Sequence, residues 1–140
     1  MPRLQGRIDL DGAIIAVRIE LGTTAETFLR AAGRSVPPPV ATTALIDIGA
    51  SHTVVHPMIL DRFGGPYSAR GWVSVPGQPE VILNHYDVRV ILGDHRPAFE
   101  VQAVKLAPAT HTVAVLIGRD LLKQGVLLYD GQNETFSFWF

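Results

Sequence analysis

The sequence consists of short apolar runs separated by turn residues, a pattern typical of β-strands. Residues 7–10 and 13–20 flank Asp11 and Gly12, a pair that favours a β-hairpin. Residues 87–92 alternate between polar and apolar side chains, as expected for a strand with one buried face. Further runs predict strands at residues 43–47, 53–56, 71–75, 81–83, 98–106, 113–117, 126–129 and 134–140. The pattern therefore predicts a mainly β chain.

Three short segments carry helix signals instead. Thr23 and Glu26 have the spacing of a capping box, which predicts a short helix beginning there. Pro57 suits the first turn of a second helix over residues 58–63. Residues 120–124 predict a third helix, with an acidic residue at the positive N-terminal end of its dipole. We expect all three helices to be minor additions to the sheet.

Composition and charge favour a single folded domain and argue against nucleic-acid or membrane binding. The chain has 140 residues, 47% of them apolar and 18% charged, which fits one folded domain over residues 1–140. The net charge of -1 gives no general attraction to nucleic acid or to an acidic membrane surface. No apolar run approaches the length that spans a bilayer, and Arg3, Arg7 and Asp9 precede any apolar run. We therefore expect a cytoplasmic protein without a nucleic-acid or membrane partner.

One acidic segment carries candidate chemistry. Residues 45–51 read Leu-Ile-Asp-Ile-Gly-Ala-Ser, so that Asp47 ends a strand expected to run into the core. Gly49 permits a tight turn directly after the acid. A carboxylate at such a position is costly unless it is paired or used. The residues alone leave two interpretations open: a functional acid, or a turn-capping aspartate held by nearby amides.

A second segment lies about seventy residues downstream. Residues 115–122 read Val-Leu-Ile-Gly-Arg-Asp-Leu-Leu, with the glycine leading into a short helix. Taken in order, the two segments resemble the signature motifs of the retropepsin-like aspartic proteases, in the manner of a single-domain bacterial member. In that family the first motif carries the catalytic acid and the second packs behind it. The resemblance covers residues 8–140, with residues 22–40 as a looser insertion, and implies a closed β-barrel with a flap hairpin and one or two short helices.

The resemblance implies an aspartic endopeptidase. Asp47 matches the catalytic acid, and the chain has a single Asp-x-Gly triplet of this kind, so a homodimer would be needed to bring two copies of Asp47 together. Two adjacent carboxylates share one proton and activate a water for attack on a peptide bond. The family mechanism uses no metal and no cofactor. The expected partners are a second copy of the chain and an extended peptide or unfolded protein substrate.

The family also implies roles for the residues around Asp47. Residues 72–83 match the flap hairpin that closes over bound peptide. Substrate contacts are expected from the acid loop and from the flap tip, at Gly49, Ala50, Ser51, Val75, Pro76, Gly77 and Gln78. Structural support for the acid is expected from Ile48, Gly118, Arg119 and Asp120.

Two positions depart from the family pattern. Ile48 stands where the family has Thr or Ser, which removes two hydrogen bonds across the dimer, at about 1 kcal/mol each. This change leaves an alternative open: a weakly active or inactive module for dimerisation or peptide binding. Ser51 replaces an acid of viral members, so we expect Arg119 to brace the loop through carbonyl groups or the Ser51 hydroxyl. A third alternative is an unrelated small β-domain in which Asp47 is structural.

Histidines and aromatic residues give weaker signals. His52 and His56 have the i, i+4 spacing of a helical metal site, but Pro57 disfavours helix at His56 and no third ligand follows. The remaining histidines are expected at the surface or in turns, at His85, His95 and His111. Aromatic residues alternate along the last strand, at Phe136, Phe138 and Phe140, which fits either a core strand or a strand at a dimer interface.

Overall fold

The structure is a computed structural model that describes residues 1–64, 69–74, 77–96, 98–110 and 112–140. Strands account for 48% of these described residues and helices for 15%, which confirms the prediction of a mainly β fold. The predictions made for Val75, Pro76 and His111 lie outside the described residues.

Within the described residues the elements follow the predicted order. The strands are β1 (Arg3–Asp9), β2 (Gly12–Leu21), β3 (Val40–Ile46), β4 (Val54–Val55), β5 (Ala69–Val73), β6 (Val81–Leu92), β7 (Phe99–Lys105), β8 (Val115–Ile117), β9 (Val126–Asp130) and β10 (Thr135–Trp139). The helices are α1 (Thr23–Ala31), α2 (Pro57–Phe63) and α3 (Arg119–Leu122). The runs predicted at 81–83 and 87–92 form one strand, because the polar residues between them continue the extended backbone of β6.

Six of the strands close into a barrel. Their order is β6-β7-β4-β8-β3-β2, and a further pairing of β2 with β6 joins the two ends. Inward-facing aliphatic side chains from these strands are buried and fill the interior, where they supply most of the hydrophobic stabilisation. The core includes Val17, Ile19, Ala44, Val55, Val88, Val90, Ala103, Val115 and Ile117. The closed barrel agrees with the predicted architecture.

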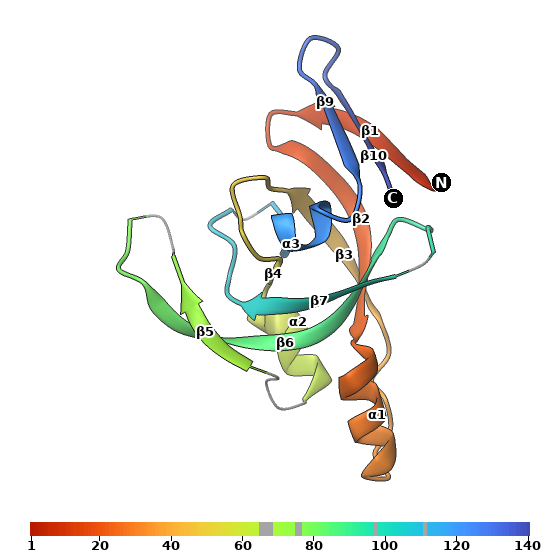
Figure 1. Ribbon diagram of the computed structural model, residues 1–140, viewed down its shortest axis with the longest axis vertical. Coiled ribbons are helices and arrows are strands. Elements are labelled where there is room, and N and C mark those ends of the chain that lie inside the picture. Colours follow the sequence, from red (N-terminus) through yellow and green to blue (C-terminus); the bar gives the residue numbers. More distant parts are fainter. Residues whose placement is uncertain (65–68, 75–76, 97, 111) are drawn as a thin grey trace.

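Strand β8 is the link between the two sequence segments of interest. It lies between β3 and β4, parallel to β3 with Ile46 opposite Ile117, and antiparallel to β4 with Val54 opposite Leu116. The chain therefore leaves β3 at Asp47, loops around the end of β8 and returns as β4. This order places the acid loop, residues 47–53, directly beside the turn from β8 into α3 (Figure 1).

The terminal strands form an extension of the barrel. β1 pairs with β10, with Arg3 opposite Trp139, and β10 pairs with β9, so that the two chain ends lie side by side (Figure 1). Phe136 and Phe138 are fully buried within the chain. The core-strand interpretation of β10 is therefore confirmed, with a strand on each side of β10, while a role of this strand at a dimer interface stays a prediction. The outer strand of this extension is β9.

The first residues of helices α1 and α2 show which of the predicted helix-start signals are present in the structure. The capping box predicted at Thr23 is wrong: Gly22 is the N-cap, and the N–H of Ala25 in the first turn donates to the carboxylate of Asp87 instead. The Thr23 hydroxyl donates to Glu100, while Glu26 pairs with basic side chains. Helix α2 begins at Pro57 as predicted, because proline tolerates the first helical turn. Its end is at Gly64, whose φ of 61° favours glycine.

A hairpin of β5 and β6 projects from the barrel. Trp72 lies opposite Ile82 in this hairpin, and both side chains are largely exposed. In Figure 1 the hairpin extends away from the body of the molecule, while the other end of β6 continues into the barrel wall. The hairpin thus has an exposed apolar surface and a base that is part of the barrel wall.

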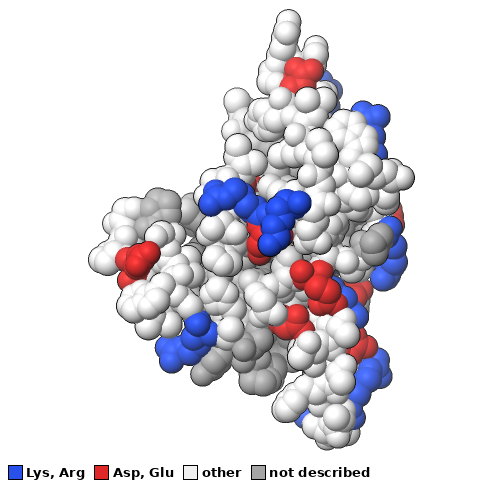
Figure 2. All heavy atoms as spheres, viewed as in Figure 1, with Lys and Arg blue, Asp and Glu red and all other residues white. Residues whose placement is uncertain are grey.

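The charged groups on the surface are dispersed. On the described part of the face in Figure 2, most of the surface is uncharged, and acidic and basic side chains occur in small separate groups. This agrees with a net charge of -1. None of the helices in the described ranges is long and apolar enough to cross a membrane.

Candidate functional site

Asp47 lies at the point where β3 ends and the acid loop begins. Its N–H donates to the carbonyl oxygen of Ile117 at 3.0 Å, which ties the residue to β8. Its Oδ1 accepts the N–H of Gly49 at 2.9 Å, and its carbonyl accepts the N–H of Ala50 at 3.2 Å. In the described part of the chain, Oδ2 accepts no hydrogen bond. The half-buried carboxylate is therefore fixed through one oxygen and free at the other.

The turn after Asp47 depends on a residue without a side chain. A Cβ placed on Gly49 would lie 3.1 Å from Oδ1 of Asp47, closer than ordinary van der Waals contact. Glycine therefore permits the short hydrogen bond between its amide and the carboxylate. The amide contact is the one that a turn-capping aspartate makes, so this bond by itself does not separate a structural acid from a functional one.

Ile48 occupies the tip of the acid loop. Its side chain is 67% exposed, although isoleucine is among the residues most often buried in folded chains. It directly follows Asp47 in the sequence, at the point where the loop leaves the barrel. An apolar side chain and an acid are thus presented together at the surface.

Arg119 braces this loop from the second motif. Its Nη1 donates to the carbonyl oxygens of Ile48 and Gly49, at 2.8 and 3.2 Å. Its backbone N–H donates to the carbonyl of Ala50 at 2.9 Å. The expectation that Arg119 braces the loop through carbonyl groups is confirmed. The Ser51 hydroxyl makes a different contact, at 2.9 Å from Nδ1 of His52.

Asp120 fixes the far end of the acid loop. Its Oδ1 accepts the backbone N–H of Thr53 at 2.9 Å and the Thr53 hydroxyl at 2.8 Å. The same hydroxyl oxygen accepts the N–H of Gly118 at 3.2 Å. Because Thr53 is fully buried, each of these polar groups needs its partner. Asp120 and Thr53 therefore join the two motifs into one hydrogen-bonded unit.

Gly118 allows the two segments to approach each other. A Cβ at this position would lie 2.4 Å from the carbonyl carbon of His52 and 2.8 Å from the nitrogen of Thr53. Backbone atoms cannot move aside as a flexible side chain can, so any larger residue would push the acid loop away from β8. The glycine of the second motif is thus required by packing against the first.

His85 corrects the prediction that it lies at the surface or in a turn. It is 8% exposed, within β6, and its ring meets that of His52 edge to face with centroids 5.4 Å apart. Burial lowers the pKa of His85, the neighbouring His52 lowers it further, and the Asp120 carboxylate acts in the opposite direction. The contact places the longer strand of the projecting hairpin beside the acid loop.

The remaining predicted residues are distributed as follows. Gly77 and Gln78 lie exposed beyond β5, and in the described residues no hydrogen bond or ion pair joins them to the acid loop. His56 caps α2, since its Nδ1 accepts the N–H of Met58, whereas His52 contacts Ser51 and His85. The two histidines considered as metal ligands thus serve different neighbours.

Two residues of the site were not found from the sequence. Thr53 precedes two valines in an ordinary β-prone run, so nothing marked it before Asp120 was placed beside it. His85 follows an asparagine, and its position looked like a break between two strands rather than the interior of one. The only signal was the pair of apolar runs on either side, which form one strand in the structure.

The comparisons with known proteins leave the family open. The chain matches no protein-family model, and no curated protein matches its sequence. The resemblance to retropepsin-like aspartic proteases therefore remains a proposal that depends on the motifs and on the geometry of the acid loop.

Proposed function

We propose that this chain is a retropepsin-like aspartic endopeptidase that acts as a homodimer, in which Asp47 of each copy supplies one carboxylate of the catalytic pair. The observation that carries the proposal is the state of the Asp47 carboxylate. One oxygen is fixed by the amide of Gly49, the other accepts no hydrogen bond in the described residues, and Arg119 holds the loop that presents it. A second copy of the loop, facing this one across a two-fold axis, completes the site.

The proposed reaction uses the two carboxylates in different protonation states. Two carboxylates in contact hold one proton between them, because both cannot be ionised at that distance. The ionised one takes a proton from water as the water oxygen bonds to the carbonyl carbon, and the protonated one gives its proton to the carbonyl oxygen. Proton transfer to the nitrogen then accompanies cleavage of the C–N bond. An acid and an amine are released and the pair regains its single proton.

The substrate in this proposal is an extended peptide. It lies across the acid loop at Gly49, Ala50 and Ser51, with the β5–β6 hairpin over it as a flap and with Gly77 and Gln78 at the flap end. Extended peptides bind chiefly through main-chain hydrogen bonds, which suit the exposed backbone of this loop. The exposed side chains of Trp72 and Ile82 support the proposal, since they offer apolar surface on the hairpin.

Ile48 favours a second candidate function. In the proposed dimer its exposed side chain packs against its counterpart, in place of the hydrogen bonds that Thr or Ser makes in the family. Such packing stabilises the pair of loops without fixing the carboxylates as firmly. The second candidate is therefore a dimer of the same form that binds peptide and cleaves it weakly or not at all.

The test compares cleavage of an unfolded protein by the wild type, Asp47→Asn and Asp94→Asn, from mildly acidic to neutral pH. Asp94 is an exposed turn residue and serves as the matched control for loss of a carboxylate. We expect cleavage by wild type and by Asp94→Asn, no cleavage by Asp47→Asn, and dimers of all three in sedimentation. Equal cleavage by Asp47→Asn would overturn the proposal. Cleavage that appears only with Ile48→Thr would favour the second candidate.

A further inference from the structure

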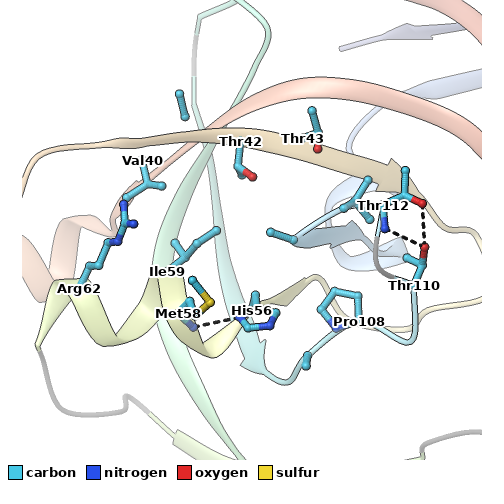
Figure 3. Close-up of a pocket in the computed structure, with 14 residues that line it drawn as sticks. Val40, Thr42, Thr43, His56, Met58, Ile59, Arg62, Pro108, Thr110 and Thr112 are labelled. Carbon is cyan, nitrogen blue, oxygen red and sulfur yellow. Dashed lines mark hydrogen bonds between the residues drawn. The ribbon is translucent and has the colours of Figure 1, made fainter.

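A groove of about 540 Å³ lies outside the acid loop, with no residue of that loop in its lining. It runs between the first half of β3, helix α2 and the segments 107–110 and 112–114 (Figure 3). Its volume falls within the range of known ligand sites, roughly 300–1,000 Å³. The groove lining combines threonine hydroxyls, aliphatic side chains, one histidine and one arginine.

One wall of the groove is an open strand edge. β3 pairs with β2 from Val40 to Leu45, but its pairing with β8 begins only at Ala44. Within the described residues, positions 40–43 therefore have no strand on the groove side. In an antiparallel pair, alternate residues turn their N–H and C=O groups away from the partner strand. Backbone groups of this stretch consequently face the groove and can pair with an added extended chain.

The opposite wall carries a cation. Arg62, in the last turn of α2, is exposed and points toward Val40 in Figure 3. It makes no hydrogen bond or ion pair in the described part of the chain, whereas the neighbouring Asp61 is paired with Lys105 at 2.6 Å. The positive charge at the mouth of the groove is therefore available to an external carboxylate.

His56 adds a second donor. Its Nδ1 accepts the N–H of Met58 at 3.0 Å, so this nitrogen carries no proton. The proton of the neutral ring must then be on Nε2, which makes that atom a donor. Figure 3 shows the ring among the residues that line the groove. Nε2 of His56 and the guanidinium of Arg62 are therefore both hydrogen-bond donors, which favours a ligand with acceptor groups.

We propose that this groove binds an extended peptide segment that pairs with the edge of β3 and places a carboxylate against Arg62. The four residues at positions 40–43 offer an edge of roughly 13 Å, at about 3.3 Å per residue. The carboxylate belongs to an acidic side chain or to a chain end, which supply the same chemistry. The inference is independent of the proposed function, because none of these residues takes part in the acid loop.

The binding test uses fluorescence anisotropy in the Asp47→Asn background, so that no probe is cleaved. The labelled probes are the amides of Gly-Glu-Val-Thr-Val-Thr-Val-Glu-Gly and of its counterpart with glutamine for both glutamates. A glutamine probe with a free carboxyl end separates the chain-end source from the side-chain source. Arg62→Gln removes the cation, and Arg7→Gln, at an exposed position on β1, is the matched control.

We expect the glutamate probe to bind more tightly than its glutamine amide counterpart, and Arg62→Gln to weaken it about five-fold while Arg7→Gln leaves it unchanged. Tighter binding of the free-carboxyl probe alone would assign the carboxylate to a chain end. Equal binding of all three probes, or no effect of Arg62→Gln, would overturn the proposal.

The position of the bound peptide is tested by amide chemical shifts of the same variant with the glutamate probe. We expect the largest changes at residues 40–43. Changes confined to the acid loop, or to the edge strands β5 and β9, would contradict the assignment of the groove. Thermal unfolding of Arg62→Gln beside the parent shows whether a loss of binding reflects a loss of fold.

Discussion

The guanidinium of Arg119 donates to the carbonyl oxygen of Ile48 at 2.8 Å, although the two residues are 71 positions apart in the chain. This contact joins the loop that carries Asp47 to the turn between β8 and α3. The shape of the acid loop is therefore a property of both motifs together. Three of the predictions below test this connection, since each removes one part of it.

Replacing Arg119 by Gln should loosen the acid loop. The change removes the charge-assisted hydrogen bonds to the carbonyls of Ile48 and Gly49. Because the guanidinium is exposed, we expect a loss of about 1 kcal/mol in the free energy of unfolding, measured with urea. Arg119→Lys is the matched control. Its free energy of unfolding should fall by less than that of Arg119→Gln, since lysine keeps the cation but not the planar fork. No change in Arg119→Gln would show that the brace contributes nothing to stability.

Thr53→Val should destabilise the fold more than its change in shape suggests. The substitution keeps the volume but removes the hydroxyl that donates to Asp120 and accepts from Gly118. Buried polar groups would lose their partners, at a cost of about 1–3 kcal/mol. Thr53→Ser keeps the hydroxyl and should cost less. If the two variants had equal unfolding midpoints, the hydroxyl would have no part in stability.

Gly118→Ala should disrupt the contact between the acid loop and β8. The new Cβ would lie 2.4 Å from the carbonyl carbon of His52, where backbone must move to make room. Overpacking of this kind costs about 1–3 kcal/mol, and sometimes more. Gly131→Ala is the control, because a Cβ there meets no atom within 4 Å. Thermal unfolding of both variants checks the prediction, which is contradicted if they melt together.

The stability of the chain should fall as the pH drops below the ordinary histidine pKa. Burial and His52 place the pKa of His85 below its usual value of 6.5, so the unfolded chain takes up a proton that the folded chain does not. The His85 contribution is thus complete above 6.5 and is lost as the pH falls below it. Asp120 opposes the shift but does not reverse it.

The His85 prediction is checked by urea unfolding at about pH 8 and about pH 5. His85→Gln should lower the difference in stability between the two pH values, and His95→Gln, in the turn after β6, should leave it as in the wild type. The same pH dependence in all three proteins would mean that His85 does not titrate as proposed.

Much of the fold follows from local signals in the sequence. The first hairpin turns at Leu10 and Asp11, one residue before the predicted turn, and like the terminal hairpin it depends on local turn chemistry. The helix that begins at Pro57 depends on proline chemistry. The closed barrel, by contrast, came from the resemblance to a family. Alternating runs predict strands but do not say which strands are neighbours.

The parts that the sequence did not reveal depend on distant partners. Glu26 has capping-box spacing but pairs with Arg30 and Arg89, the latter on β6, so tertiary contacts replaced the local cap. His85 is buried because β6 runs unbroken from the hairpin into the barrel. Thr53 becomes part of the site only through Asp120, from the other motif. Asp47 was chosen from the sequence as a candidate acid, while the absence of a hydrogen bond to its Oδ2 in the described residues is seen only in the structure.

The central claim is that two chains, each with one Asp47, make one active site. The most direct measurement is cleavage by a fixed amount of wild type mixed with increasing Asp47→Asn, after the subunits have exchanged. If mixed dimers are inactive, activity per wild-type chain should fall to about half at equal amounts and to about one tenth at a nine-fold excess. Activity per wild-type chain that stays constant at every ratio would contradict the account.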